Sequence, residues 1–213
     1  LLMKQPVIVC LDLEGVLVPE IWISLAEATQ IDDFRLTTRD ISDYDVLMRK
    51  RLQILDVHSL RLQDIHAAVN TLNPLEGANE FLNSLRETYQ VVILSDTFYQ
   101  VIKRLMNKLN YPTLFSHSLE IDPDGPIHQY HLRQHDQKRK AVMAFKGLNF
   151  YVLAAGDSYN DTTMLQSADK GIFFRPPESI IQEFPNFPVT QTYAELRAQL
   201  DKAASLQCPL PSR

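Results

Sequence analysis

The sequence predicts an α/β protein with a doubly wound, Rossmann-like parallel sheet, a helical cap inserted after the first strand and a small β-hairpin insertion. Three observations predict this fold. Short apolar runs rich in β-branched residues alternate with segments of helical periodicity. Each of the three strongest runs ends in a cluster of polar residues. The stretch between the first two of these runs carries helical spacing alone.

The first apolar run, Val7–Leu11, is flanked by Pro6 and Gly15, which is typical of a short strand buried on both faces of a parallel sheet. Three further segments follow the same design: Val91–Leu94, Tyr151–Ala155 and Gly171–Phe174. Helical periodicity occurs in five segments around them: Asn79–Tyr89, Gln100–Leu109, Lys138–Leu148, Thr162–Ala168 and Tyr193–Ala204. Ligands of such sheets bind beyond the carboxyl ends of the strands, where the polar clusters are expected to converge.

Two insertions interrupt the alternation of strands and helices. Residues 19–74 contain three segments of helical spacing and are predicted to form a cap: Ile21–Thr29, Tyr44–Val57 and Leu62–Leu72. Residues 119–132 are predicted to form a small surface β-hairpin around the turn signal Asp122-Pro123-Asp124-Gly125. The remaining residues, 1–18 and 75–213, are assigned to the catalytic core.

Composition limits the classes of function. The chain has 213 residues, 45% of them hydrophobic, which is sufficient for one packed domain with an insertion. A net charge of −5 argues against nucleic-acid binding, and the cluster Lys138-Arg139-Lys140 is too short to change this. No apolar stretch is long enough to span a membrane. Cys10 and Cys208 have no disulfide or metal-ligand spacing, so a cytoplasmic location is expected.

Asp12 and Glu14 place two carboxylates directly after the first strand, and Gly15 permits a tight turn there. A divalent cation would relieve their mutual repulsion, and Mg²⁺ prefers oxygen ligands of this kind. One acid could then act as a proton donor. Taken alone, the pair is equally compatible with two loop acids that cap the following helix.

Two weaker signals fit the same chemistry. Ser95 and the backbone N–H groups of Asp96 and Thr97 form a polar turn that could cradle phosphate oxygens, although helix capping explains this turn equally well. Lys138 opens a helical segment from which its ammonium could reach the same phosphate, and Lys140 and Lys146 compete for that role.

The most specific signal is Gly156-Asp157-Ser158-Tyr159-Asn160-Asp161. Two acids four residues apart at a strand end, with a glycine before them and an amide between them, indicate a site for a cation and its ligand. This cluster completes the order Asp-x-Glu, Ser, Lys and paired acids along the chain.

That combination resembles the haloacid dehalogenase-like superfamily of aspartate-nucleophile phosphatases over the whole chain. Five stretches are similar to the narrower group of bacterial ThrH proteins: residues 12–23, 37–40, 43–48, 94–99 and 154–165. The ThrH group comprises phosphoserine phosphatases that also transfer phosphate from phosphoserine to homoserine. Glu14 stands where the wider superfamily usually has Asp, and the ThrH group shares this Glu.

The resemblance implies a role for each motif residue. Asp12 is expected to be the nucleophile and a magnesium ligand, Glu14 the general acid/base with its carbonyl on the metal, and Asp157 the third ligand, with Asp161 in a supporting position. Ser95, Asp96, Thr97 and Lys138 are expected to bind phosphate. In the cap, Glu20 and Arg51 are expected to hold the substrate's ammonium and carboxylate, with Asn160 nearby on the core.

The expected function is therefore that of a magnesium-dependent phosphoserine phosphatase, with phosphoserine as donor and water or homoserine as acceptor. The oligomeric state, a homodimer included, is left open. A phosphatase of another small phosphomonoester is the main alternative. The length of the chain and the cap argue against a phospho-accepting signalling domain. A binding protein without catalytic activity is disfavoured because every residue type that the chemistry requires is present. A dehalogenase is disfavoured because it would have no use for the two acids Asp157 and Asp161.

Overall fold

The computed structural model describes residues 4–37, 40–41, 43–122 and 125–207. Its centre is a seven-stranded sheet in the order β4-β3-β2-β1-β5-β6-β7, in which every neighbouring pair is parallel except β3 and β4. The doubly wound α/β fold is therefore confirmed. The strands are Val7–Leu11 (β1), Gln90–Phe98 (β2), Thr113–Ile121 (β3), Ile127–His131 (β4), Tyr151–Gly156 (β5), Lys170–Phe174 (β6) and Val189–Thr190 (β7).

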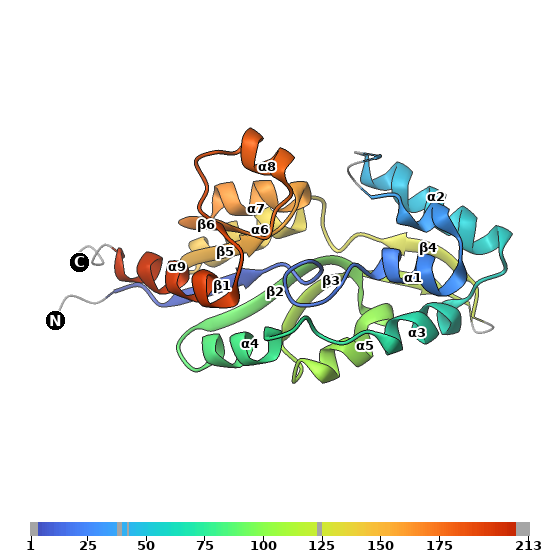
Figure 1. Cartoon of the computed structure of the whole chain (residues 1–213), viewed down its shortest axis with the longest axis horizontal. Helices are drawn as coiled ribbons and strands as arrows, with labels where there is room; N and C mark the ends of the chain where they lie inside the picture. Colours follow the sequence, from blue (N-terminus) through green and yellow to red (C-terminus); the bar gives the residue numbers. More distant parts are fainter. Residues whose placement is uncertain (1–3, 38–39, 42, 123–124, 208–213) are drawn as a thin grey trace.

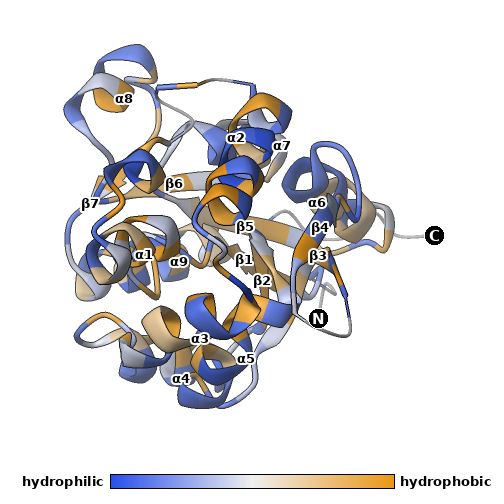
Figure 2. Cartoon of the chain, turned by 90° about the vertical axis from the view of Figure 1, so that its right-hand side faces the viewer, coloured by the Kyte–Doolittle hydropathy of each residue, from blue (hydrophilic) through white to orange (hydrophobic). Residues whose placement is uncertain are grey.

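Strand β1 lies in the middle of the sheet because its side chains are apolar on both faces. Val9 is paired with Val91 of β2 on one side and with Leu153 of β5 on the other. Val9, Cys10 and Leu11 have no exposed surface, and the central strands are predominantly hydrophobic (Figure 2). Because β1 is covered on both faces, its first polar residue, Asp12, comes only after the carboxyl end of the strand.

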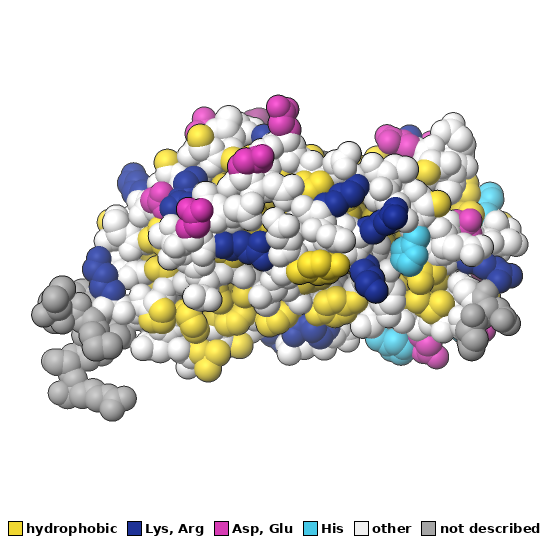
Figure 3. Space-filling view, turned by 90° about the horizontal axis from the view of Figure 1, so that it is seen from below, with side chains coloured by type: hydrophobic (Ala, Val, Ile, Leu, Met, Phe, Trp, Pro, Cys, Tyr) yellow, Lys and Arg dark blue, Asp and Glu magenta, His cyan; other side chains and the backbone are white. Residues whose placement is uncertain are grey.

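Helices cover both faces of the sheet (Figure 1). Ala78–Arg86 (α4), Tyr99–Lys108 (α5) and Tyr193–Ser205 (α9) pack on one face, while Gln137–Gly147 (α6) and Thr162–Ser167 (α7) pack on the other. Seen from the α4–α5 side, Lys and Arg side chains are spread along the whole length of the molecule (Figure 3). No helix of the described residues is long and apolar enough to cross a membrane.

The segment between β1 and α4 is helical and lies at the end of the sheet toward which β1 points (Figure 1). It contains Ile21–Thr29 (α1), Tyr44–Val57 (α2) and Leu62–Thr71 (α3), together with the short 3₁₀ helix Asp32–Arg35 (η1). Helix α3 packs on α5, and α2 packs on β4. The three expected cap helices are thus confirmed, and η1 is an addition to them.

Several elements differ from the expectation. Strand β2 continues through Ser95-Asp96-Thr97 to Phe98, so these polar residues lie in an irregular strand end rather than in a turn. The predicted hairpin is present as β3 and β4, but β3 begins earlier than expected, at Thr113, and pairs with β2, so the hairpin extends the main sheet. The helix Glu178–Glu183 (α8) and strand β7 had no recognised pattern. Of the residues discussed above, Thr38, Arg39, Pro123, Asp124 and Cys208 lie outside the described residues.

Candidate active site

The carboxyl ends of β1, β2 and β5 bring three polar clusters together below the cap, as the order of the strands requires. Asp12 follows β1, Ser95 lies in the last part of β2, and Asp157 follows β5. The Asp12 N–H donates to the Ala155 carbonyl at 3.0 Å, which fixes the start of the first loop against β5. The Leu13 N–H donates to Asp12 Oδ1 at 2.7 Å and orients that carboxylate.

Asp12, Asp157 and Asp161 form a buried group in which one carboxylate oxygen from each lies within 4.8 Å of the others. Burial, Asp161 and Asp157 raise the pKa of Asp12 well above its usual range, against the opposing effect of Lys138. The Asp157 carboxylate lies directly against the backbone of Gly15. Only glycine permits this contact, since a Cβ at residue 15, whose φ is +76°, would lie 2.3 Å from Asp157 Oδ2. A compact set of oxygen donors that repel one another suits a hard divalent cation.

Asp161 differs from the other two acids because both of its oxygens are already hydrogen-bonded. Its Oδ2 accepts from the Asp157 N–H at 2.9 Å and from the Ser158 N–H at 3.2 Å. Its Oδ1 accepts from Lys138 Nζ at 2.7 Å. Asp161 therefore orients the Asp157 loop and the lysine.

Lys138 lies in the first turn of α6, and its side chain is almost completely buried. Its Nζ lies 2.8 Å from Asp12 Oδ1 and 3.7 Å from Asp96 Oδ2, in addition to its contact with Asp161. Burial alone would lower the pKa of Lys138, but the three carboxylates outweigh it and raise that pKa well above its usual range.

The two competing lysines do not reach this group of acids. Lys140 is exposed, and Lys146 Nζ pairs with Asp169 Oδ1 at 3.0 Å. Lys138 is consequently the lysine whose ammonium contacts Asp12 in the described part of the chain.

Ser95 and Thr97 lie at the end of β2, each with 1% of its surface exposed. The Thr97 N–H donates to Ser95 Oγ at 3.3 Å, so the backbone at the end of β2 is hydrogen-bonded to the serine hydroxyl. Thr97 Oγ1 has no hydrogen-bond partner among the described residues, and the void that Thr97 borders with Trp22 and Phe98 is too small to hold a water molecule.

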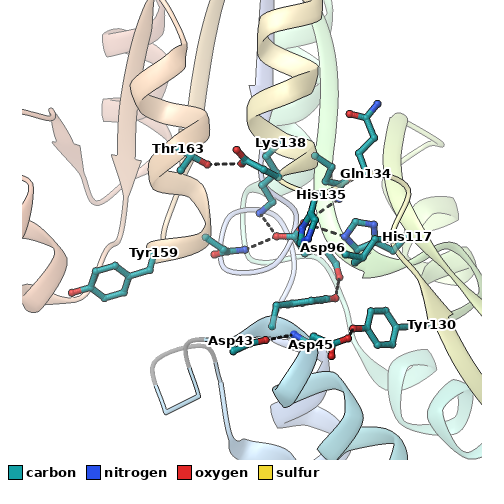
Figure 4. A pocket seen from close by; sticks show the side chains of 15 residues that line it. Asp43, Asp45, Asp96, His117, Tyr130, Gln134, His135, Lys138, Tyr159 and Thr163 are labelled. Carbon is teal, nitrogen blue, oxygen red and sulfur yellow. Dashed lines mark hydrogen bonds and ion pairs between the residues drawn. The ribbon is translucent and has the colours of Figure 1, made fainter.

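The carboxylate of Asp96 is the centre of a network that the sequence did not reveal (Figure 4). It accepts hydrogen bonds from Gln137 Nε2 at 3.1 Å and from Asn160 Nδ2 at 3.0 Å, and His117 Nε2 lies 3.5 Å away. Burial acts in the opposite direction, yet Lys138 and these hydrogen bonds lower the pKa of Asp96 well below its usual range. Asp96 thereby ties β2 to α6, β3 and the loop after β5.

A cavity of about 910 Å³ separates the cap from the core beside this network. Lys138, Asp96 and Asn160 line it from the core, and Tyr44 and Asp45 line it from α2 of the cap. Figure 4 shows Lys138 and Asp96 on one side and Asp45 on the other. A small polar ligand could therefore reach the buried lysine from solvent.

Glu14 contacts both the core loop and the cap. Its Oε1 accepts from the Ile21 N–H at 2.8 Å, so the carboxylate also caps the first turn of α1. Burial and the nearby Glu20 raise the pKa of Glu14 to about 8, although the Ile21 N–H and Arg51 oppose them. The Glu14 side chain can therefore cap helix α1 and also act as a proton donor, so the two interpretations do not exclude each other.

Arg51 of α2 is a buried cation near Glu14 and Glu20, with 7% of its surface exposed. Burial lowers its pKa to about 10 against the effect of both acids. No described carboxylate lies within 4.0 Å of its guanidinium, and Arg51 Nε has no hydrogen-bond partner there. A buried guanidinium with a free donor is suited to an anionic ligand.

The fold and this arrangement define the class of protein. The family model of the haloacid dehalogenase-like hydrolases matches residues 8–169, a span that begins in β1 and extends beyond the Asp157–Asp161 loop. The chain belongs to this family.

Individual relatives narrow the comparison. The chain is 59% identical to "Phosphoserine phosphatase ThrH" of Pseudomonas aeruginosa over 93% of its own length and 97% of the relative's. It is 57% identical to "Phosphoserine phosphatase" of Pseudomonas syringae pv. tomato over 95% of its length and 86% of the relative's.

A solved structure supports the fold. The "Phospho-Aspartyl Intermediate Analogue of Phosphoserine phosphatase" superposes with a TM-score of 0.74 and 20% identity, over 93% of this chain and 99% of the other.

Proposed function

We propose that this protein is a magnesium-dependent phosphoserine phosphatase that forms an aspartyl-phosphate on Asp12. The observation that carries the proposal is the contact of Asp12 with buried Lys138, beside the carboxylates of Asp157 and Asp161. An aspartate oriented by a lysine and flanked by metal-ligand acids is equipped for nucleophilic attack on a phosphate. Two relatives above 50% identity carry the name of that activity.

The carboxylates of Asp12 and Asp157 and the backbone carbonyl of Glu14 would hold Mg²⁺, with Asp161 in support. The donor set fits this ion because it offers closely spaced oxygens and an excess of negative charge. When bound, the ion neutralises charge on the phosphoryl oxygens.

The reaction proceeds in two displacements at phosphorus. In the first, an Asp12 oxygen bonds to phosphorus, the bond to the serine oxygen breaks, and Glu14 donates a proton to that oxygen. A pKa of about 8 keeps Glu14 protonated near neutrality for this task. In the second, Glu14 takes a proton from the acceptor, whose oxygen attacks phosphorus and releases Asp12. Lys138 offsets negative charge in both steps.

Two groups of residues bind the substrate in this proposal. Ser95, the N–H groups of Asp96 and Thr97, and Lys138 hold the phosphate. In the cap, Arg51 binds the carboxylate and Glu20 the ammonium, with Asn160 nearby. This division of work corresponds to a cap of residues 19–74 on a core of residues 1–18 and 75–213, with the hairpin of 119–132 belonging to the core.

We further propose that homoserine can replace water as acceptor. Homoserine is serine lengthened by one methylene, so the site vacated by serine could hold it. The burial of Arg51 and the partial burial of Glu14 limit the access of water to the same site, which favours transfer.

The test is to incubate the protein with phosphoserine and Mg²⁺, with and without homoserine, and to follow free phosphate and phosphohomoserine. Phosphoserine should be hydrolysed faster than other small phosphomonoesters, and Asp12→Asn should abolish turnover while circular dichroism remains unchanged. Undiminished turnover by Asp12→Asn would refute the nucleophile. Faster hydrolysis of an unrelated phosphomonoester would instead refute the substrate.

A further inference from the structure

Trp22 is the only tryptophan of the chain, and none of the roles above involves it. It lies in the first turn of α1 and is partly buried. The guanidinium carbon of Arg51 lies 4.5 Å from the centroid of its ring, which is cation–π distance. Phe34 of η1 contacts the same ring at a centroid distance of 5.7 Å, so the indole is itself held in place.

The guanidinium of Arg51 is restrained from two directions. One face lies over the Trp22 ring. At one end of the group, Nη2 donates to the Leu36 carbonyl at 2.9 Å and Nη1 contacts Met48 Sδ at 3.7 Å. Arg51 Nε remains without a partner among the described residues. A planar group that is held on one face and at both Nη atoms has little freedom to reorient its remaining donors.

We infer that Trp22 is a positioning residue that fixes Arg51 for the carboxylate of an α-amino-acid phosphomonoester. The inference rests on the proposed function, because it assigns Arg51 to the carboxylate end of phosphoserine. Trp22 acts through Arg51 and not on the phosphate. Its loss should weaken selection for an amino-acid substrate while the phosphoryl-transfer chemistry at Asp12 continues.

The experiment compares phosphoserine with p-nitrophenyl phosphate, which has no carboxylate or ammonium. Trp22→Met keeps an apolar side chain but removes the aromatic face, whereas Trp22→Phe keeps a smaller one. Leu25→Val is the matched control, because Leu25 is a fully buried core residue of the same helix.

Trp22→Met should raise KM for phosphoserine about tenfold, the loss expected of a partly desolvated cation–π contact, with little change in kcat. Its kcat/KM for p-nitrophenyl phosphate should stay within about twofold of the wild-type value. Trp22→Phe should recover most of the lost phosphoserine affinity, and Leu25→Val should leave the ratio between the two substrates unchanged.

Equal losses on both substrates in Trp22→Met would overturn the inference, because they would indicate general damage to the cap. An unchanged KM for phosphoserine would overturn it as well. If Trp22→Met does not fold, the same comparison with Trp22→Phe decides: the smaller ring should raise KM for phosphoserine slightly and leave that for p-nitrophenyl phosphate unchanged, and equal rises on both substrates would overturn the inference. Failure of the proposed function would be visible separately, as wild-type protein that does not hydrolyse phosphoserine.

Discussion

The ammonium of Lys138 contacts Asp12 and Asp161 and lies 3.7 Å from Asp96, while Asp157 completes the acidic group. Without a metal ion, several buried carboxylates therefore share one buried ammonium. Such a cluster is costly to bury and is retained where its charge is used, as at a catalytic centre. The roles of the individual residues can be separated by substitution.

Arg51→Ala should raise KM for phosphoserine by about 10- to 100-fold, because a hydrogen bond between charged groups contributes about 1.5–3 kcal/mol. Hydrolysis of p-nitrophenyl phosphate should change little. Arg49→Ala is a control on the same helix, since Arg49 is exposed and pairs with Asp45. Steady-state kinetics on both substrates make the comparison. Parallel losses on both substrates would remove Arg51 from the amino-acid pocket.

Glu14 should make the stability of the metal-free protein depend on pH. Its pKa rises from 4.5 to about 8 on folding, so the folded state binds this proton more tightly than the unfolded state. The resulting stabilisation is complete below pH 4.5 and is lost as pH rises through about 8. In EDTA, the melting temperature of the wild type should fall between pH 6 and 9 by about 5–10 °C more than that of Glu14→Gln. Identical falls would contradict the assignment.

The sequence predicted which residue types form the site but not how their side chains are connected. Asp12, Asp157 and Lys138 were predicted to lie together because strand-end acids and a helix-start lysine have recognisable contexts, and the structure brings them together. The network around Asp96 was missed, since its partners His117 and Gln137 belong to segments without a motif. Hydrogen bonds between distant segments leave no spacing pattern in one sequence.

At the scale of elements, α2 is tied to the core by two tyrosines on opposite sides of the interface. Tyr44 of α2 donates its hydroxyl to the Asp96 carbonyl at 2.7 Å. Tyr130 of β4 donates in the other direction, to the carboxylate of Asp45 on α2. The Asp96 carbonyl that Tyr44 contacts belongs to the same peptide group as the Thr97 N–H, one of the groups proposed to bind phosphate. The position of the cap is therefore coupled to this phosphate cradle, formed by Ser95, Asp96 and Thr97.

Tyr44→Phe should therefore weaken phosphate binding as well as the attachment of the cap. Loss of one hydrogen bond costs about 1 kcal/mol, which corresponds to about a fivefold rise in the inhibition constant of inorganic phosphate. Tyr130→Phe removes a cap contact that does not end on the cradle, and should leave phosphate inhibition unchanged. Competitive inhibition assays distinguish the two variants. An equal effect of both would show that only cap attachment matters.

The boundaries of helices and strands were predicted well where the apolar residues follow a single spacing throughout the segment. The bounds of α1 and α2 agree with the expected Ile21–Thr29 and Tyr44–Val57, because their apolar residues follow helical spacing throughout. The start of β3 was missed because Ser116 and His117 are buried polar residues inside a strand, which breaks its apolar signal. Both are satisfied by tertiary hydrogen bonds: Ser116 to the Thr97 carbonyl, and His117 from the Arg133 N–H.

At the scale of the whole molecule, Mg²⁺ should stabilise the fold because it relieves repulsion among buried acids. Binding at 100 times the dissociation constant contributes about 2.7 kcal/mol, or about 5–10 °C in melting temperature for a chain of this size. Asp157→Asn should reduce this gain without lowering the melting temperature of the metal-free protein, since it removes a charge that repels Asp12. Thermal melts in Mg²⁺ and in EDTA provide the measurement. A full gain in Asp157→Asn would exclude Asp157 as a ligand.

The central place of β1 has a consequence for biosynthesis. Val9 is translated before its two partners in the sheet: Val91 follows only after the cap, and Leu153 only after the cap and much of the core. Pairings so distant in sequence close large loops, which slows folding and delays the native sheet. One side of β1, the strand that precedes Asp12, consequently stays unpaired until β5 and the loop with Asp157 and Asp161 have been translated. A nascent chain interrupted before that loop would lack two of the three acids of the buried group and would be a candidate for chaperone binding.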